Sequence, residues 1–142
     1  RTPLGLRGSS MGGYLALTSA AAAGADAVVA ICPAGAEHLR AGLQAPDRFA
    51  FPRDQPALEG LLDRHDVHDA VRALDLPLLL LHARGDVQIP VEHSQQLAAL
   101  ARQGRYVELP GGHHQSIQHD AEMLGVTVRF LARALTAVAA GR

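Results

Sequence analysis

Residues 8–12 read Gly8-Ser9-Ser10-Met11-Gly12, which matches the pattern G-x-S-x-G around a central serine. An apolar run of strand length precedes them, and residues 11–23 are rich in Ala and Leu, which favours a helix. Gly24 follows as a helix stop. The pattern therefore predicts a strand that turns sharply at Ser10 and continues as a helix, with small residues on both sides of the turn to avoid steric collision.

Ser10 is a candidate nucleophile because such a turn raises its hydroxyl above the sheet at the start of a helix. The backbone N–H of Met11 would then point at an oxyanion that forms beside it. Ser9 is the competing serine. A pattern centred on Ser9 would place Arg7 and Met11 at the positions that need small residues, and their side chains are too large for the turn. A Gly/Ser-rich turn without any chemistry is the alternative interpretation of these residues.

The rest of the chain alternates apolar runs with helix-forming segments. Continuous apolar runs predict buried strands, and they cover residues 3–7, 27–32, 76–82 and 105–109. The predicted helices cover residues 11–23, 58–64, 68–74, 94–102 and 117–139, while 36–56 looks irregular. Alternating strands and helices predict a single α/β domain over 1–142, with a parallel sheet flanked by helices and a small cap or insertion at 36–74.

Composition and charge exclude several classes of protein. The chain has 142 residues, of which 48% are hydrophobic and 19% charged, so it is globular rather than disordered. The formal net charge is −1, which gives no electrostatic reason to expect a nucleic acid or an anionic membrane as partner. We find no apolar run of transmembrane length. The single cysteine, Cys32, excludes an internal disulfide and fits a cytoplasmic location, as a buried structural thiol.

Further polar residues follow two of the predicted strands, in the order that a Ser–acid–His triad requires in an open α/β sheet. Asp86 lies in a loop after the strand 76–82 and would orient an imidazole. His113 and His114 follow the last strand in a Gly-rich turn, and either would serve as general base because imidazole titrates near neutral pH.

At these residues the chain resembles the α/β-hydrolase superfamily. Residues 3–13 look like its fifth strand and nucleophile turn, and residues 76–90 resemble its acid loop, with Ala83 in place of a usual glycine. Residues 110–114 resemble the Pro-Gly-x-Gly-His turn before the final helix, and counting from Pro110 favours His114 as the base, with His113 as the alternative.

The resemblance implies a serine hydrolase that cleaves a carboxylic ester or related acyl bond of a small molecule through an acyl-enzyme, without a cofactor. It also implies a partial fold without the N-terminal strands, one of whose loops supplies a second oxyanion donor. Loss of one donor costs on the order of a hundredfold in rate. We therefore expect the chain alone to be weakly active or poorly soluble, with self-association through an exposed sheet edge. The alternative function is a non-catalytic or truncated hydrolase-like fragment that acts as a binding or structural module.

Other polar and aromatic residues are less informative. Residues 65–69, with His65, His68 and Asp69, hold groups that bind metals, but a solvated helix start explains them equally well, so we expect no metal. Phe49 and Phe51 in the insertion would either line an acyl pocket or anchor the insertion to the body.

Overall fold

A computed structural model describes residues 1–45 and 52–141, and its centre is a four-stranded parallel sheet in the order β1-β2-β3-β4. The strands are β1 (Gly5–Ser9), β2 (Ala27–Ile31), β3 (Leu78–Ala83) and β4 (Gly104–Leu109). Each strand pairs in register with the next, as in Gly5 with Ala27 and Val28 with Leu78. The predicted α/β class with a parallel sheet is confirmed.

Six α-helices and one 3₁₀ turn are described between and after the strands. They are α1 (Met11–Ala23), α2 (Ala36–Gln44), α3 (Gln55–Arg64), α4 (Val67–Ala73), α5 (Val91–Leu100), η1 (Ile117–His119) and α6 (Ala121–Ala140). Helix α1 has the predicted bounds, and Gly24 ends it in the left-handed region at φ 65°, where its N–H bonds to the carbonyl groups of Ala20 and Ala21.

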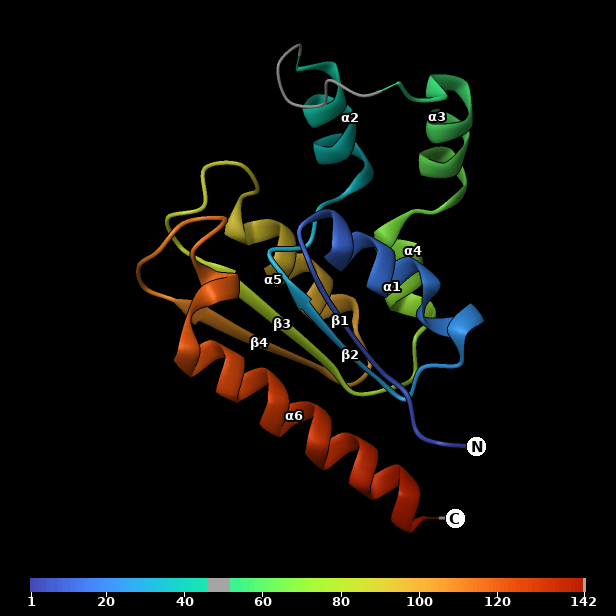
Figure 1. Ribbon diagram of the computed structural model, residues 1–142, viewed down its shortest axis with the longest axis vertical. Helices are drawn as coiled ribbons and strands as arrows, with labels where there is room; N and C mark the ends of the chain where they lie inside the picture. The colour runs from blue at the N-terminus through green and yellow to red at the C-terminus, as the bar shows by residue number, and fades with distance from the viewer. Residues whose placement is uncertain (46–51, 142) are drawn as a thin grey trace.

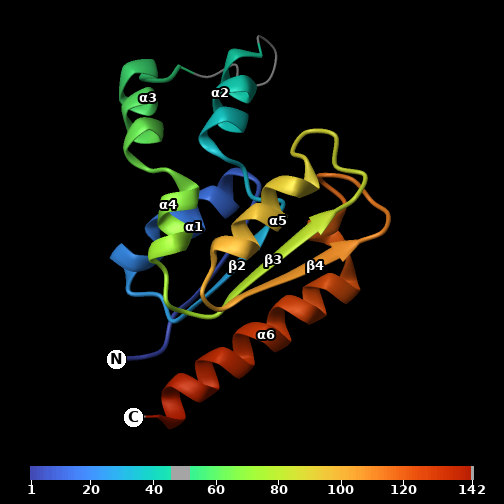
Figure 2. The ribbon, with the colours of Figure 1, turned by 180° about the vertical axis from the view of Figure 1, so that it is seen from behind.

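The helices cover the two faces of the sheet unequally. Helix α6 runs along one face, whereas α1, α4 and α5 cover the other (Figures 1 and 2). Successive strand residues point to opposite faces. Val28 and Leu80 accordingly lie in the core beneath α1, α4 and α5, and Val29 and Leu81 lie in the core beneath α6. Residues of β2 and β3 are buried on both faces, which explains their continuous apolar sequences.

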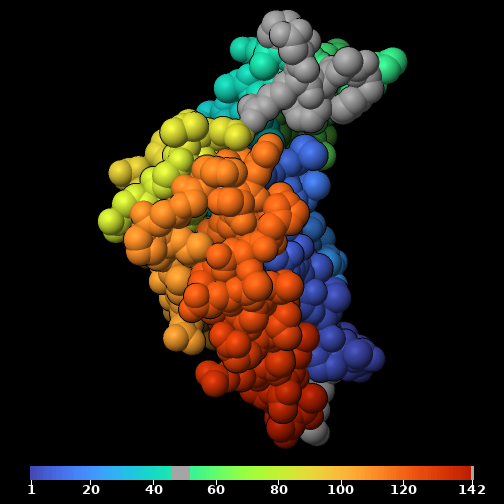
Figure 3. All heavy atoms as spheres, turned by 60° about the vertical axis from the view of Figure 1, so that its left-hand side comes forward, coloured from blue at the N-terminus to red at the C-terminus, as the bar shows by residue number. Residues whose placement is uncertain are grey.

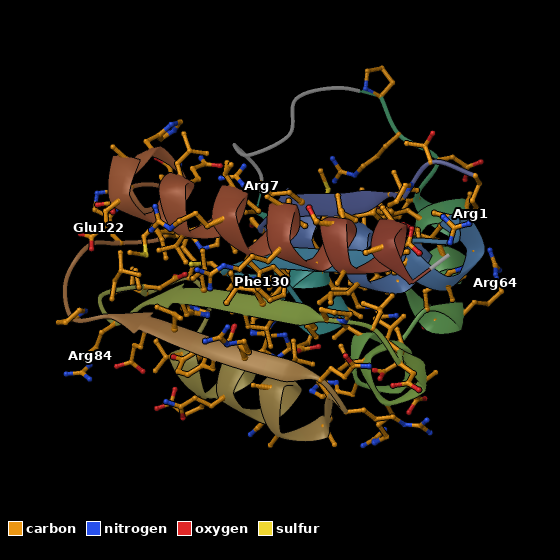
Figure 4. The ribbon with its side chains drawn as sticks, turned by 90° about the horizontal axis from the view of Figure 1, so that it is seen from below. Arg1, Arg7, Arg64, Arg84, Glu122 and Phe130 are labelled. Atoms are coloured by element: carbon orange, nitrogen blue, oxygen red, sulfur yellow. The ribbon has the colours of Figure 1, made fainter. Side chains whose placement is uncertain are left out.

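By length and composition alone, helix α6 is long and apolar enough to span a membrane. The expectation that no segment reaches transmembrane length is therefore wrong for this helix. In this fold it lies along the sheet, and Phe130 points from it toward the strands (Figure 4). Spacings of three and four residues predict an apolar face on this helix that comprises Leu124, Val128, Leu131, Leu135 and Val138. Leu124 and Val128, however, are 48% and 54% exposed. Leu131 packs in the core as predicted, but it does so together with Met123, Val126 and Phe130, which lie beside the predicted face.

The main error in the expected elements is helix α2, which falls within the segment 36–56 that looked irregular. The prolines of that segment all follow the helix, and Ala36–Gln44 contains good helix formers such as Ala, Leu, Glu and Arg. Its apolar residues Leu39 and Leu43 are four apart and pack against the hydrophobic core cluster that includes Leu62 of α3. Strand β4 also differs, because it forms an edge of the sheet and is only partly buried.

Residues 36–74 connect β2 to β3. We call α2 and α3 the cap, because they rise beyond the carboxyl ends of the strands, away from the layers of the body (Figures 1 and 3). Helix α4 lies back against α1, with Val67 and Val71 in the core beside Tyr14. The Tyr14 hydroxyl donates to the carbonyl oxygen of His65 at 2.6 Å, which ties α1 to the end of α3. Phe49 and Phe51 lie outside the described residues.

Candidate active site

Ser10 lies on a sharp turn between β1 and α1 with φ 55° and ψ −117°, a backbone conformation that L-residues rarely adopt. Three backbone hydrogen bonds hold this turn. The Ser10 N–H donates to the Ile31 carbonyl at 2.9 Å, and its own carbonyl accepts the N–H groups of Tyr14 and Ala34 at 3.1 Å. Hydrogen bonds to β2, to α1 and to the loop after β2 thus stabilise the strained backbone conformation of Ser10.

The two glycines of the pattern behave differently. A Cβ atom at Gly8 would come within 1.9 Å of the Gly12 carbonyl oxygen, so a side chain cannot be accommodated without moving the backbone. A Cβ atom at Gly12 would meet no atom within 4 Å. The expectation that both positions must be small is therefore right for Gly8 and wrong for Gly12, because the turn brings α1 over β1 but leaves the Gly12 side of the helix open.

Asp86 lies in the loop after β3 with its side chain buried. Its Oδ1 accepts the backbone N–H groups of Gln88 and Ile89 at 2.8 and 2.9 Å. Burial by itself would raise the pKa of Asp86. The Ile89 N–H, the bond to His114 and the Gln88 N–H outweigh it, so the pKa is lowered and the carboxylate stays ionised.

His114 connects the acid loop with the serine. Its Nδ1 lies 2.6 Å from Asp86 Oδ2, and its Nε2 lies 2.8 Å from Ser10 Oγ. A carboxylate only accepts, so Nδ1–H donates to Asp86 and Nε2 is left to accept the Ser10 hydroxyl. The neighbouring His113 is exposed, and its backbone instead closes a turn with Ser116.

Close contact between two loops makes this alignment possible. A Cβ atom at Gly85 would come within 2.2 Å of the Gly112 carbonyl oxygen, and Gly112 itself has φ 81°. Glycine at both positions lets the loop after β3 touch the loop after β4, so Asp86 meets His114. The three side chains that the sequence singled out therefore form one hydrogen-bonded line at the carboxyl ends of β1, β3 and β4.

No family model matches the chain, and no curated protein matches it. Solved structures, in contrast, do match the chain. Est1E from Butyrivibrio proteoclasticus aligns with a TM-score of 0.72 and 21% identity, over 97% of this chain and 62% of that one. The esterase domain of a Rhodothermus marinus protein aligns with a TM-score of 0.63 and 28% identity, over 79% of this chain and 52% of that one. Mouse alpha/beta hydrolase domain-containing protein 10 aligns with a TM-score of 0.71 and 17% identity, over 97% and 64%.

The chain has the α/β-hydrolase fold. It spans between about half and two thirds of the length of these solved structures, so it corresponds to part of the fold. Within this α/β-hydrolase fold, Ser10 lies after the first described strand, and the line Ser10–His114–Asp86 crosses the top of the sheet.

A cavity of about 790 Å³ opens at Ser10 and His114. Most of its walls are apolar and come from the cap and from α1. The cap contributes Leu39, Leu43, Leu58, Leu61 and Leu62, and α1 contributes Met11 and Leu15. Ser9 also lines this cavity, but Ser10 is the serine that bonds to His114. The α/β-hydrolase fold therefore places the hydroxyl of Ser10 at the mouth of an apolar pocket.

Met11 begins α1, so its N–H is among the first four of the helix, which have no partner within the helix. Its side chain is half exposed. The role of this N–H as an oxyanion donor stays a prediction.

His82 and Ser94 are two buried polar residues beside the site. The sequence did not indicate a role for either of them. His82 Nδ1 lies 2.7 Å from Ser94 Oγ, and its Nε2 lies 3.0 Å from the Ile89 carbonyl oxygen and 3.3 Å from Asp86 Oδ2. Burial lowers the pKa of His82, so the ring is neutral near pH 7. Both neighbours of Nε2 accept, so Nε2 carries the proton and Nδ1 accepts from Ser94. His82 thus holds the far side of the Asp86 loop. The one available signal was its position at the end of a buried strand.

Cys32 follows β2 and is buried, as expected for a structural thiol. Burial raises the pKa of its thiol to about 12, so the thiol stays protonated. It lies close to Asp86 and His114, with one donor atom of each within 4.8 Å of the others. A protonated thiol in this place is a poor nucleophile.

Proposed function

We propose that this chain carries the catalytic residues of a serine hydrolase that cleaves a carboxylic ester or related acyl bond. One observation carries the proposal: the continuous hydrogen-bond line from Ser10 Oγ through the His114 ring to Asp86 Oδ2, with distances of 2.8 and 2.6 Å. The alignment with solved esterases and serine hydrolases supports the hydrolase class.

The proposed reaction has two steps. Ser10 Oγ attacks the substrate carbonyl carbon while its proton passes to His114 Nε2, and the carbonyl π electrons move onto oxygen. Asp86 stabilises the imidazolium, and the N–H of Met11 donates to the oxyanion. When the tetrahedral intermediate collapses, the bond to the leaving oxygen breaks and that oxygen takes the proton from Nε2. Water then attacks the acyl-enzyme with His114 again as base, which releases the acid and restores Ser10.

The apolar walls of the cavity support a substrate with an apolar group of moderate size. Five leucines of the cap face the space above Ser10, and burial of apolar area gives about 25 cal/mol per Å². With p-nitrophenyl esters of increasing chain length, we expect kcat/KM to rise from acetate to octanoate, mainly through KM. An unchanged or falling kcat/KM would contradict the apolar-substrate part of the proposal and leave the reaction class intact.

A fluorophosphonate probe tests the reaction class directly, because it reacts only with an activated serine. We expect labelling of the full chain at Ser10 that is lost in Ser10→Ala and strongly reduced in His114→Ala. Ser9→Ala is the matched control, since Ser9 lines the same cavity, and it should keep the labelling. His113→Ala should also keep it, because this histidine is exposed. Absence of labelling in the folded wild-type chain would favour the alternative of a non-catalytic binding module.

A further inference from the structure

Three histidines outside the proposed triad converge at the place where the cap leaves the body, and one of them, His38, also lines the cavity at Ser10. His38 lies in the first turn of α2, His68 in the first turn of α4 and His93 in the first turn of α5. The His93 ring contacts both others edge to face, with ring centroids 4.8 Å from His38 and 5.4 Å from His68. Three of the eight histidines of the chain are thus brought together by folding.

A carboxylate completes the cluster. Glu37 Oε1 lies 3.2 Å from His38 Nδ1 and 4.0 Å from His93 Nδ1. Glu37, His38 and His93 each offer one donor atom such that all three atoms lie within 4.8 Å of one another. We propose that Glu37, His38 and His93 bind one divalent transition-metal ion of the zinc class at the junction of the cap and the body.

His93 is the independent indication that something binds here. Its side chain is only 6% exposed, yet Nε2 is buried without a hydrogen-bond partner among residues 1–45 and 52–141. Buried polar atoms in proteins are almost always paired, and an unpaired one calls for an explanation. A metal ion bound at Nε2 would supply the missing partner, and one bound at Nδ1 would fix the proton on Nε2.

The backbone before α2 is shaped to admit the carboxylate. A Cβ atom at Gly35 would lie 2.6 Å from Glu37 Oε1 and 2.7 Å from Oε2. The Glu37 carboxylate therefore folds back over a position where a side chain is missing. Since Gly35 has φ −99°, its backbone conformation is open to any residue, and the value of glycine here lies in the space it leaves.

Without a metal ion, His38 Nδ1 accepts the backbone N–H of Gly35 at 2.9 Å. A metal ion that takes this nitrogen must displace that N–H, so we expect affinity in the micromolar range rather than that of a preformed structural zinc site. The N-terminal turns of α2, α4 and α5 also carry partial positive charge, which opposes a cation. The negative charge of Glu37 must compensate for it, and its removal should be the most damaging change.

Two imidazoles and one carboxylate are a donor set that zinc accepts, with water in a further position, whereas magnesium and calcium prefer oxygen ligands alone. The sequence pattern at residues 65–69 pointed to a different set, His65 with His68 and Asp69. Folding instead gathers donors from separate helices, two from the start of the cap and one from α5. A bound ion would therefore link α2 to α5.

Isothermal titration of the full chain with zinc chloride at pH 7.5, in excess magnesium, tests the proposal. We expect one zinc ion per chain, and at least a tenfold weaker affinity in Glu37→Gln, whose exposed side chain makes this substitution tolerable for the fold. His93→Asn should abolish this binding. Gly35→Ala should weaken it by displacing the Glu37 carboxylate, while His119→Ala, a change at an exposed histidine, should bind as the wild type does.

Cys32, Asp86 and His114 are a second group that offers donor atoms to zinc, so the titration is repeated in His114→Ala. Retention of one zinc ion in that variant assigns the ion to the junction of the cap and the body. The proposal is overturned if wild-type chain binds no zinc at millimolar concentration, if Glu37→Gln binds as tightly as the wild type, or if binding is lost in His114→Ala. None of these results depends on hydrolytic activity.

Discussion

At the scale of single residues, the strained turn depends more on one glycine than on the other. Gly8→Ala would push its Cβ to 1.9 Å from the Gly12 carbonyl, so we expect a loss of at least about 2 kcal/mol in the free energy of unfolding. Gly12→Ala meets no atom within 4 Å and lies in a helix, so it should be neutral or stabilising by up to about 1 kcal/mol. Urea denaturation of the two variants measures both effects. A Gly8→Ala variant as stable as the wild-type chain would show that backbone movement relieves the collision at Gly8.

His82 is a residue whose importance comes from burial. His82→Phe removes both ring nitrogens and leaves the Ser94 hydroxyl and the Ile89 carbonyl unpaired, at a cost of about 1–3 kcal/mol in stability for each unsatisfied group. The loop that carries Asp86 then loses one support, and we expect kcat of the folded variant to fall about tenfold or more with KM little changed.

Ser94→Ala is the matched variant, since Ser94 contacts His82 but lies one step further from Asp86. It should lower kcat less than His82→Phe does. The measurement is ester hydrolysis per active site, counted by fluorophosphonate titration. Full kcat in folded His82→Phe would contradict a role of His82 in positioning Asp86.

At the scale of elements, Asp120 decides where the last helix begins. The sequence predicted one helix over 117–139, but the chain forms a 3₁₀ turn at Ile117–His119, and α6 starts after Asp120. The Asp120 carboxylate accepts the Met123 N–H at 2.9 Å, which satisfies one of the free N–H groups of the first turn.

We expect Asp120→Ala to lower the free energy of unfolding by about 1 kcal/mol through loss of this cap. Glu122→Gln is the control, because Glu122 lies in the same turn and acts on the helix only through its charge. It should cost no more than about 0.5 kcal/mol at moderate salt. Thermal unfolding of the two variants gives the comparison, and equal shifts in Tm would mean that charge rather than the hydrogen bond stabilises this end.

At the scale of the whole molecule, buried titratable groups predict how stability depends on pH. Burial lowers the pKa of His82 in the folded chain, whereas an unfolded histidine titrates near about 6.5. Below that pH the unfolded chain takes up a proton that folded His82 does not, so stability falls as the pH drops from about 6.5 toward the lowered folded value. Asp86, whose folded pKa is also lowered, adds stability that is lost only at more acidic pH.

Urea denaturation between pH 7 and pH 5 should therefore show a decreasing free energy of unfolding for the wild-type chain. The decrease should be smaller in His82→Phe, because this variant lacks one of the groups that bind a proton on unfolding. A free energy that is constant or increases toward pH 5 would contradict the assignment of His82 as a neutral buried ring.

Local sequence determines those features that depend on few neighbours. The strand–turn–helix at Ser10 follows from small residues at the turn and helix formers after it. Strands β2 and β3 follow from unbroken apolar runs, because only a strand covered on both faces needs such a run. The order Ser10, Asp86, His114 along the chain also suggested which side chains to compare, since the ends of parallel strands lie at one edge of a sheet.

Tertiary packing decided features in which distant segments meet. His114 rather than His113 faces Ser10 because the loops touch at Gly85 and Gly112, a contact between residues 27 positions apart. The apolar face of α6 was predicted correctly at Leu131 but not at Leu124 and Val128, because helical periodicity defines a face only approximately and the sheet selects the residues that it covers. The cluster of His38 and His93 was likewise hidden, since its members come from separate helices. Local propensity acts over a few residues, whereas burial, loop contact and the convergence of polar groups exist only once the chain has folded.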